Sequence, residues 1–353
     1  MIVLHVIDVA NPQGNGVAVA VSAYISQLRH IAEVATYNLA GKVAEKATPS
    51  FSGAIYGKIS ELPRPFNTPD LVVFNEVYKK GYLKLYKECI KRNIRYIVIP
   101  HGCLMENSQK RKRLKKIIGN KFFFKKFIEN AQAIQFLCAE EEKQMPFTYK
   151  KAIIAGNGVE ICNTNNNCPS SKDLVYIGRY DVFHKGLDRI VDICAKNKEW
   201  FRNSGIKIRF YGRDSANGLK ILRRQIAQEG VSDIVVINGS VYGAKKEEVL
   251  NKAYLFIQCS RYEGLPMGII EALAHGIPCI VTKGTNMAEY INANECGFGD
   301  DDMDRLFEKI ANICENDTIR NKYSTKAFRA AKNDFEIASI IRKTAKEYEG
   351  ILK

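Results

Sequence analysis

Short apolar runs alternate with longer amphipathic stretches along most of the chain. The runs are rich in valine and isoleucine and almost continuous in apolar residues, which is typical of strands buried on both faces of a parallel sheet. Helices are predicted between them, for example over residues 18–29, 81–92 and 187–197. This alternation predicts βαβ units and a doubly wound α/β fold. Strands are predicted at residues 2–8, 71–74, 96–99, 133–137, 174–177, 206–211, 234–237, 254–257 and 278–281.

The alternation is interrupted once, at residues 161–173 (ICNTNNNCPSSKD), where polar and turn-forming residues cluster without apolar periodicity. We interpret this segment as a linker between two βαβ domains, residues 1–165 and 166–333. A length of 353 residues also exceeds one typical core. After residue 318 the sequence is helical to its end, and residues 334–353 are predicted as a C-terminal helix.

The net charge of +15 is unevenly distributed. Residues 1–165 carry 24 basic and 13 acidic side chains, a net +11, and the remainder carries 29 and 25, a net +4. The first domain is therefore expected to face something anionic. Nucleic acid, anionic lipid and phosphorylated substrates are all open at this point.

The ten cysteines include no C-x-x-C pair, so a zinc site and a disulfide framework are both disfavoured, and a reducing cytosol is the default expectation. The apolar start of the chain reads as a strand rather than a signal peptide. No apolar run approaches the roughly 20 residues that a membrane-spanning helix needs.

Ligands of open α/β sheets bind beyond the carboxyl ends of the strands, so residues that directly follow strands are the candidates. Gly14 and Gly16 follow the first strand and precede a helix, where backbone N–H groups can meet an anion; a plain tight turn is the alternative. The pattern lacks a third glycine and a suitably placed acid, which disfavours NAD. His101 ends another strand, and a structural histidine is the alternative there.

Two charged motifs follow strands of the second domain. Arg179 and Lys185, flanked by glycines, could hold a diphosphate, or they could be solvated loop cations. Glu263 and Glu271 bracket a Gly/Pro turn whose N–H groups, from Gly264 to Gly268, precede a helix that begins near Met267. Two solvated glutamates near a helix start are the alternative.

Residues 109–127 (QKRKRLKKIIGNKFFFKKF) hold nine cations and no acid. Leu114, Ile117 and Ile118 share a helical face, and Phe124, Phe127 and Ile128 repeat that triplet. The combination suits an anionic membrane surface. A solvated helix packed on the sheet and a nucleic-acid patch are the alternatives, although no nucleic-acid fold signature accompanies the segment.

Together these motifs resemble the retaining GT-B nucleotide-sugar glycosyltransferases of group 1, or family 4. GRYDVFHKG resembles the family's Gly-Arg…Lys-Gly element, and RYEGLPMGIIEALAHGIPCIV resembles its Glu-x7-Glu element with the following helix and strand. AGNGVE (residues 155–160) resembles the Asn-Gly-Val-Asp/Glu signature, and IPHG resembles the His-Gly element. The motifs occur in order and cover nearly the whole chain, most strongly over residues 174–291.

The resemblance implies site residues. Glu263, Arg179, Lys185 and His101 would be catalytic, with Arg179 and Lys185 stabilising the leaving diphosphate and Glu263 near the transferred sugar. Glu271 would bind the ribose hydroxyls, and the loop at residues 239–242 would lie near the base. Much of the family has two adjacent glycines after the first strand, whereas here Asn15 separates Gly14 from Gly16. The implied donor-binding set is Gly14, Gly16, Arg179, Lys185, Val241, Tyr242, Glu263, Gly264, Leu265, Pro266, Met267, Gly268 and Glu271.

The implied fold is α/β, GT-B, with two Rossmann-like domains facing a central cleft and the C-terminal helix crossing back onto the first. The implied donor is a nucleotide sugar, with UDP-sugars expected first. No cofactor or essential metal is expected: no D-x-D motif that would hold a metal against the diphosphate is evident, because the acids at residues 300–304 lie beyond the last motif and read as a solvated helix start. The acceptor would be a saccharide or polyprenyl-diphosphate-linked sugar of bacterial surface polysaccharide synthesis.

The protein would then be cytoplasmic, bound peripherally to the inner membrane face through residues 109–128, with no nucleic-acid partner. Two other functions stay open on the same fold. One is a non-catalytic basic protein that binds lipid or nucleic acid, and the other is a GT-B nucleotide-sugar epimerase.

Overall fold

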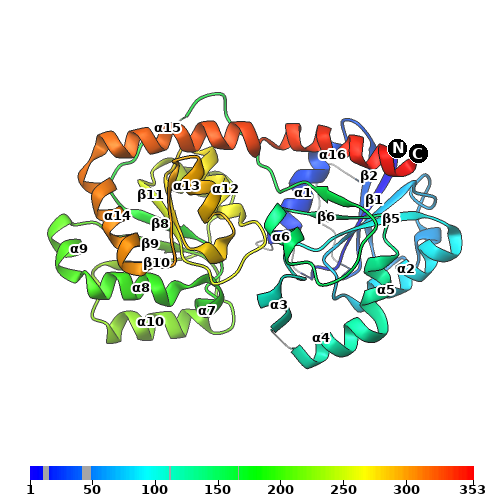
Figure 1. The fold of residues 1–353 in the computed structure, drawn as a ribbon, viewed down its shortest axis with the longest axis horizontal. Coiled ribbons are helices and arrows are strands. Elements are labelled where there is room, and N and C mark those ends of the chain that lie inside the picture. Colours follow the sequence, from blue (N-terminus) through cyan, green and yellow to red (C-terminus); the bar gives the residue numbers. More distant parts are fainter. Residues whose placement is uncertain (11–15, 42–48, 111–112, 166) are drawn as a thin grey trace. The chain divides into compact units, whose positions relative to one another are not determined.

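The computed structural model describes residues 1–10, 16–41, 49–110, 113–165 and 167–353. The chain forms two compact units (Figure 1): residues 1–158 with 337–353, and residues 159–336. The first boundary therefore follows Gly158, where the sequence predicted residue 165. The C-terminal segment that rejoins the first unit begins at Ile337, where the sequence predicted residue 334. The chain passes from one unit to the other twice, after Gly158 and after Glu336. The two segments lie side by side, because the Val159 N–H donates to the Phe335 carbonyl at 2.9 Å.

The first unit is built on a seven-stranded sheet in the order β3-β2-β1-β4-β5-β6-β7. Every neighbouring pair in it is parallel, as the apolar runs predict. The strands are β1 (Ile2–Ile7), β2 (Glu33–Asn38), β3 (Ser50–Ser52), β4 (Leu71–Asn75), β5 (Arg95–Ile99), β6 (Ala133–Phe136) and β7 (Ala152–Ile154).

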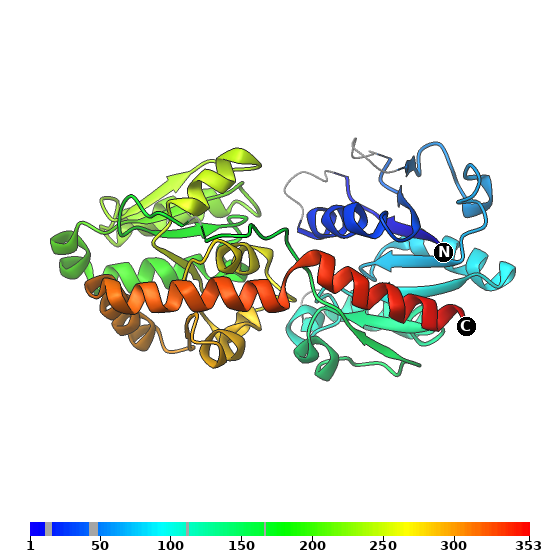
Figure 2. The ribbon, with the colours of Figure 1, turned by 90° about the horizontal axis from the view of Figure 1, so that it is seen from above.

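Helix α16 (Ile337–Leu352), the last of the chain, belongs to the first unit and packs against α1 (Gly16–Leu28) (Figure 2). Its Tyr348 is fully buried and donates a hydrogen bond of 2.6 Å to Gln135 of β6. The other helices of this unit are α2 (Lys80–Arg92), α3 (Glu106–Lys110), α4 (Arg113–Gly119), α5 (Lys125–Glu129) and α6 (Ala139–Lys143), with a short 3-10 helix, Ile59–Glu61.

The second unit has a six-stranded sheet in the order β10-β9-β8-β11-β12-β13, again parallel throughout. Its strands are β8 (Leu174–Ile177), β9 (Ile208–Tyr211), β10 (Val235–Asn238), β11 (Leu255–Gln258), β12 (Cys279–Val281) and β13 (Gly297–Gly299). Its helices are α7 (Val182–Lys185), α8 (Leu187–Lys196), α9 (Lys198–Ser204), α10 (Gly218–Gln228), α11 (Ala244–Asn251), α12 (Met267–Ala274), α13 (Ala288–Ala293), α14 (Met303–Glu315) and α15 (Asp317–Asp334), with a short 3-10 helix, Lys283–Thr285.

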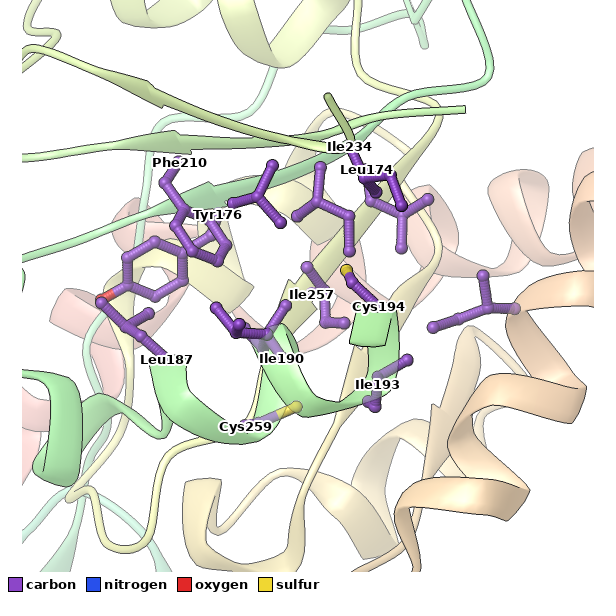
Figure 3. Packing of buried hydrophobic residues seen from close by; sticks show 14 of the residues in the cluster. Leu174, Tyr176, Leu187, Ile190, Ile193, Cys194, Phe210, Ile234, Ile257 and Cys259 are labelled. Atoms are coloured by element: carbon purple, nitrogen blue, oxygen red, sulfur yellow. The ribbon is translucent and has the colours of Figure 1, made fainter. Parts of the chain in front are cut away.

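The core of the second unit lies between its sheet and α8. Leu187, Ile190 and Cys194 recur at helical spacing and are buried against the strands (Figure 3). Tyr176 of β8 and Phe210 of β9 meet edge to face with ring centroids 5.6 Å apart. This core holds the carboxyl ends of β8 and β11 in place, and the candidate residues follow those ends.

All nine predicted strands are present, within two residues at each end. Four strands were not predicted. Three of them, β3, β7 and β13, have only three residues each and lie at sheet edges. The fourth, β2, reads EVATYN and lacks a continuous apolar run. The C-terminal helix predicted at residues 334–353 is α16, which begins at Ile337 because the preceding helix, α15, ends at Asp334.

The predicted linker is bound along the second unit, which its composition did not suggest. The Asn167 amide donates to the carbonyls of Leu250 and Ala253 at 3.3 and 3.0 Å. Asn165 donates to Ser324 at 3.2 Å. Because polar residues lack apolar periodicity, the sequence pattern does not distinguish a free linker from one held by side-chain hydrogen bonds.

The basic segment 109–128 has two parts, one with exposed and one with buried apolar side chains. Leu114, Ile117 and Ile118 of α4 are exposed by 76%, 51% and 57%, whereas Phe127 and Ile128 of α5 are fully buried. A π-helical turn, Asn120–Phe124, separates the two helices and changes which face points inward. The predicted repeat of one apolar triplet by the next is therefore wrong, and Figure 1 shows α4 apart from the sheet of its unit.

Candidate functional site in the second unit

Lys185 and Glu263 lie together because β8 and β11 are neighbours in the sheet. The loop and short helix α7 that follow β8 carry Lys185, and the loop that follows β11 carries Glu263. The Lys185 Nζ donates to Glu263 Oε1 at 2.6 Å, and both side chains are largely buried, with 15% and 11% exposed. The structure thus joins two motifs that are 78 positions apart.

One oxygen of Glu263 is fully occupied by donors. Besides Lys185, Oε1 accepts from Ser260 at 2.7 Å and from the Gln258 amide at 3.1 Å. Burial alone raises the pKa of Glu263, but the Lys185 charge and the hydrogen bonds from Lys185 and Ser260 outweigh it, so its pKa lies below the ordinary value. Glu263 is therefore an ionised carboxylate whose Oε2 accepts no hydrogen bond from the described residues.

His184, between Arg179 and Lys185, is a further functional candidate. Its ring stacks on Tyr262 at 4.2 Å, and Nε2 lies 2.8 Å from the Tyr262 carbonyl, so Nε2 carries the proton. Nδ1 is buried without a partner among the described residues. Burial lowers the pKa of His184, opposed by Glu263, which leaves a neutral ring that ties the two loops together.

Two glycines allow these loops to approach the strands closely. Gly186 has φ +62°, and a Cβ there would lie 1.8 Å from the Cys259 carbonyl oxygen. Gly268, at the start of α12, would place a Cβ 3.1 Å from the Phe256 ring. Packing therefore requires a glycine at position 186 and leaves little room for a larger residue at position 268.

The turn between the two glutamates leads directly into α12, as predicted. Leu265 and Pro266 are buried, and Met267 begins the helix. The Asn286 amide, held at φ +59°, donates to the carbonyls of Glu263 and Gly264 at 2.5 and 3.2 Å. Asn286 thus stabilises the turn from the loop after β12, and nothing in the local sequence indicated it.

Glu271, in the second turn of α12, is paired in the same way as Glu263. Lys246 of α11 donates to Glu271 Oε2 at 2.5 Å, with 22% and 17% of the two side chains exposed. Lys246 was not predicted, because α11 reads as an ordinary charged helix in the sequence.

Arg179 follows β8 directly and is half-buried. Across the described ranges it forms no ion pair, and its carbonyl accepts a hydrogen bond of 3.0 Å from Tyr176. Its charge acts on the site nonetheless, because it helps to lower the pKa of His184. Arg179 is therefore a cation at this strand end whose guanidinium is available to an anion.

In the first unit, His101 is fixed by a buried asparagine. Asn75 donates its amide hydrogens to the carbonyls of Val6 and Val73 at 3.2 and 3.3 Å, so its Oδ1 must accept from His101 Nε2 at 3.1 Å. Burial lowers the pKa of His101 to about 4. His101 is therefore a neutral Nε2–H tautomer, at φ +52° beside Gly102.

His5 lies close to His101 and is more deeply buried. Both of its ring nitrogens lack partners among the described residues. Burial, with a smaller contribution from His101, lowers the pKa of His5 to about 3. Both histidines line a cavity of about 10 Å³ together with Asn75 and Gln135, a space for about one water molecule.

The remaining candidates are placed unevenly. Gly14 lies outside the described residues. Gly16 begins α1, and a Cβ there would meet nothing within 4 Å, so packing does not explain this glycine. Val241 is buried and Tyr242 is 53% exposed. Val241 lines a cavity of about 460 Å³ beneath α11, but Arg179, Lys185, Glu263 and Glu271 do not.

Acids that could hold a metal are not grouped in the described part of the chain: no cluster of three or more such ligands occurs there. Asp302 is the N-cap of α14 and accepts from the Asp304 and Arg305 N–H groups at 2.9 and 3.2 Å. The acids at residues 300–304 therefore form a helix start, as predicted.

Residues 163–330 match the family model described as "Glycosyl transferases group 1". A curated relative, the putative colanic acid biosynthesis glycosyltransferase WcaL of Escherichia coli strain K12, is 26% identical over 142 residues. That match covers 38% of this chain and 34% of the relative, about a third of its length.

Solved structures match the whole chain at low identity. Sucrose-phosphate synthase from Thermosynechococcus elongatus aligns over 99% of this chain and 98% of its own, with a TM-score of 0.79 and 15% identity. Anabaena HepE, solved with UDP and glucose, aligns over 99% of both chains with a TM-score of 0.76 and 16% identity. At these identities the matches establish the fold, which is the two-domain GT-B fold predicted from the motifs.

Proposed function

Because residues 163–330 match the model of the group 1 glycosyl transferases, we propose that the chain moves a sugar from a nucleotide sugar to a saccharide or lipid-linked acceptor, with retention of anomeric configuration. A UDP-sugar is the proposed donor, in line with the UDP bound to HepE. Surface polysaccharide synthesis is the proposed process, in line with the name of the colanic acid relative.

The observation that carries this proposal is the buried Lys185–Glu263 pair beside Arg179. Breaking an anomeric C–O bond builds positive charge on the sugar and negative charge on the departing diphosphate. Lys185 and Arg179 would stabilise the diphosphate, and the ionised Glu263 would lie near the sugar. We propose that these two cations replace a metal ion at the diphosphate, so transfer should persist in a chelator.

The donor is best tested by a thermal-shift screen with UDP, GDP, ADP and their sugars, because a ligand that binds only the folded protein raises its unfolding temperature. Transfer would then be followed with the donor that shifts most. Lys185→Ala and Glu271→Ala should both reduce transfer; full activity in both variants would contradict the site. Nucleic-acid affinity with no nucleotide-sugar binding would favour a non-catalytic binding protein instead.

We also propose that the protein works at the anionic inner face of the cytoplasmic membrane. The support is the α4 surface, defined as exposed Leu114, Ile117, Ile118, Phe122 and Phe123 among the cations of residues 110–126. Apolar side chains surrounded by lysines suit the boundary between headgroups and acyl chains. Separately, no helix in the described ranges is both long and apolar enough to cross a membrane.

Vesicle sedimentation tests this docking. Replacing Leu114, Ile117 and Ile118 together by Gln should weaken binding to vesicles with anionic lipid by about 10-fold or more, because each loses buried apolar area. Ile221→Gln is the matched control, an isoleucine of α10 that is also 51% exposed. Equal binding by the triple variant and the control would contradict the proposal.

A further inference from the structure

Lys246 was not predicted by any motif, yet it is the residue that holds Glu271. Its Nζ lies 2.5 Å from Glu271 Oε2, and the two residues come from different helices, α11 and α12. A lysine–carboxylate contact between largely buried side chains fixes both ends far better than an exposed pair does. The orientation of the Glu271 carboxylate is therefore set from outside its own motif.

A second contact runs parallel to this one. His275 Nε2 lies 2.8 Å from Glu247 Oε2, and His275 Nδ1 lies 2.8 Å from the Glu271 carbonyl. Lys246 and Glu247 are adjacent on α11, and Glu271 and His275 are one turn apart on α12. The two contacts join α11 to α12 at neighbouring positions, although Glu247 is 60% exposed and its contact is the weaker one.

The two oxygens of Glu271 are left in different states. Oε2 accepts from Lys246, whereas Oε1 accepts no hydrogen bond from any described residue. It is also not among the fully buried atoms without partners. A carboxylate with one oxygen held by a cation and the other open can accept from a ligand hydroxyl in one fixed direction.

Helix α11 also carries the loop that precedes it. Residues 239–243 lead from β10 into α11, with Val241 buried and Tyr242 exposed. Gly243, at φ +52°, is the last residue before the helix. The α11–α12 cross-links therefore tie the loop proposed for the base to the carboxylate proposed for the ribose.

We propose that Lys246 is a positioning residue that aims Glu271 at the ribose and so makes the site select ribonucleotides over 2′-deoxyribonucleotides. This inference rests on the proposed function, since it assumes that Glu271 meets a nucleoside diphosphate. Lys246 acts through Glu271 and need not touch the nucleotide. Removing its charge should release the carboxylate without changing the fold.

Titration calorimetry measures the effect as a ratio of dissociation constants. The probes are UDP and 2′-deoxy-UDP, or the GDP or ADP pair if the thermal-shift screen selects that base. A hydroxyl bonded to a carboxylate should give the unaltered protein a preference for the ribonucleotide of about 10-fold or more. Lys246→Met should reduce that ratio to about 3-fold or less, and Lys246→Arg should retain most of it.

The control is Lys196→Met, which removes the same charge from an exposed lysine–carboxylate contact between two other helices of the unit, with Asp304 at 2.9 Å. It should bind both nucleotides as the unaltered protein does. Glu271→Gln should abolish the preference and so verifies the premise. Lys246→Met leaves a largely buried carboxylate without its partner and is expected to lower the unfolding temperature, so all dissociation constants are measured below the unfolding transition of each variant.

The outcomes are separable. If Lys246→Met keeps the full preference while Glu271→Gln loses it, the role of Lys246 is wrong and the proposed function stands. If Glu271→Gln also keeps the preference, Glu271 does not read the ribose and the inference fails with it. If the unaltered protein binds none of the three ribonucleotide diphosphates, the proposed function itself fails.

Discussion

The two units have the same kind of sheet but place opposite chemistry at their strand ends. In the second unit the candidates are charged and already paired, Lys185 with Glu263 and Lys246 with Glu271. In the first unit the described candidate is the neutral His101, held by Asn75, with a deeply buried His5 beside it. The family model also matches only the second unit, over residues 163–330.

This difference shows how strongly the chemistry of a bound ligand restricts which residues can occupy a site. A diphosphate requires cations at set positions, so the unit proposed to bind it carries motifs that can be read from the sequence. A unit proposed to face an acceptor requires surfaces of a certain character, such as the cationic and apolar α4 surface. Many sequences can form such a surface. The first unit is accordingly matched by solved structures that share its fold and not by the family model.

The largest expected effect is the loss of charge at Glu263. Glu263→Gln should lower the transfer rate by about 100-fold or more, because it removes the carboxylate that Lys185 and Ser260 orient. His101→Ala should lower it by only about 10-fold, the worth of one neutral hydrogen bond. Initial transfer rates at saturating donor measure both, and a larger loss in His101→Ala would reverse the comparison between the units.

A second prediction concerns stability within the basic segment of the first unit. Phe127→Ala should lower the free energy of unfolding by about 3–5 kcal/mol, because Phe127 is fully buried and stacks on Tyr96. Phe122→Ala, five residues earlier and 64% exposed, should change it by less than about 0.5 kcal/mol. Urea unfolding followed by circular dichroism measures both, and similar losses would contradict the division of the segment.

A third prediction uses the acid sensitivity of the first unit. The folded-state pKa of His5, about 3, lies below the ordinary 6.5, so the unfolded chain takes up a proton first as the pH falls. The contribution of the neutral His5 to the free energy of unfolding is complete above pH 6.5. It is lost as the pH falls from 6.5 toward 3, by about 1.4 kcal/mol per pH unit.

His5→Leu should reduce the slope by the contribution of one histidine, measured by urea unfolding between pH 6.5 and 4.5 with circular dichroism, and the slope due to His101, whose pKa is about 4, should remain. Trp200, the single tryptophan, lies on α9 of the second unit and provides an internal reference. Its fluorescence transition should respond equally to pH in both proteins. If the free energy of unfolding depends on pH to the same extent in the unaltered protein and in His5→Leu, His5 takes up its proton in the folded state and the prediction is wrong.

The smallest expected effect is spectroscopic. Nitrogen NMR should find His101 as the Nε2–H tautomer, with no titration between pH 8 and 5, because its pKa is about 4. Asn75→Asp should raise that pKa, since a carboxylate beside Nε2 favours the imidazolium. A His101 that titrates near 6.5 in the unaltered protein would contradict the fixed tautomer.

Much of the fold could be predicted because its signals are local. Continuous apolar runs marked nine of the thirteen strands, and the motifs after β8 and β11 marked Arg179, Lys185, Glu263 and Glu271. The missed strands are short, at sheet edges or weakly apolar. Edge strands need less burial, so they carry less of the pattern that predicts a strand.

The sequence by itself determined the parallel α/β class, the positions of nine strands along the chain and the identity of the charged motifs. Only the tertiary structure decided what those residues contact: Lys246 at Glu271, Asn75 at His101, Asn286 at the turn, and the exposure of Leu114 with the burial of Phe127. The physical reason is distance along the chain. Periodicity reports the burial of a side chain by its own element, whereas an ion pair or a tautomer depends on a partner from another element.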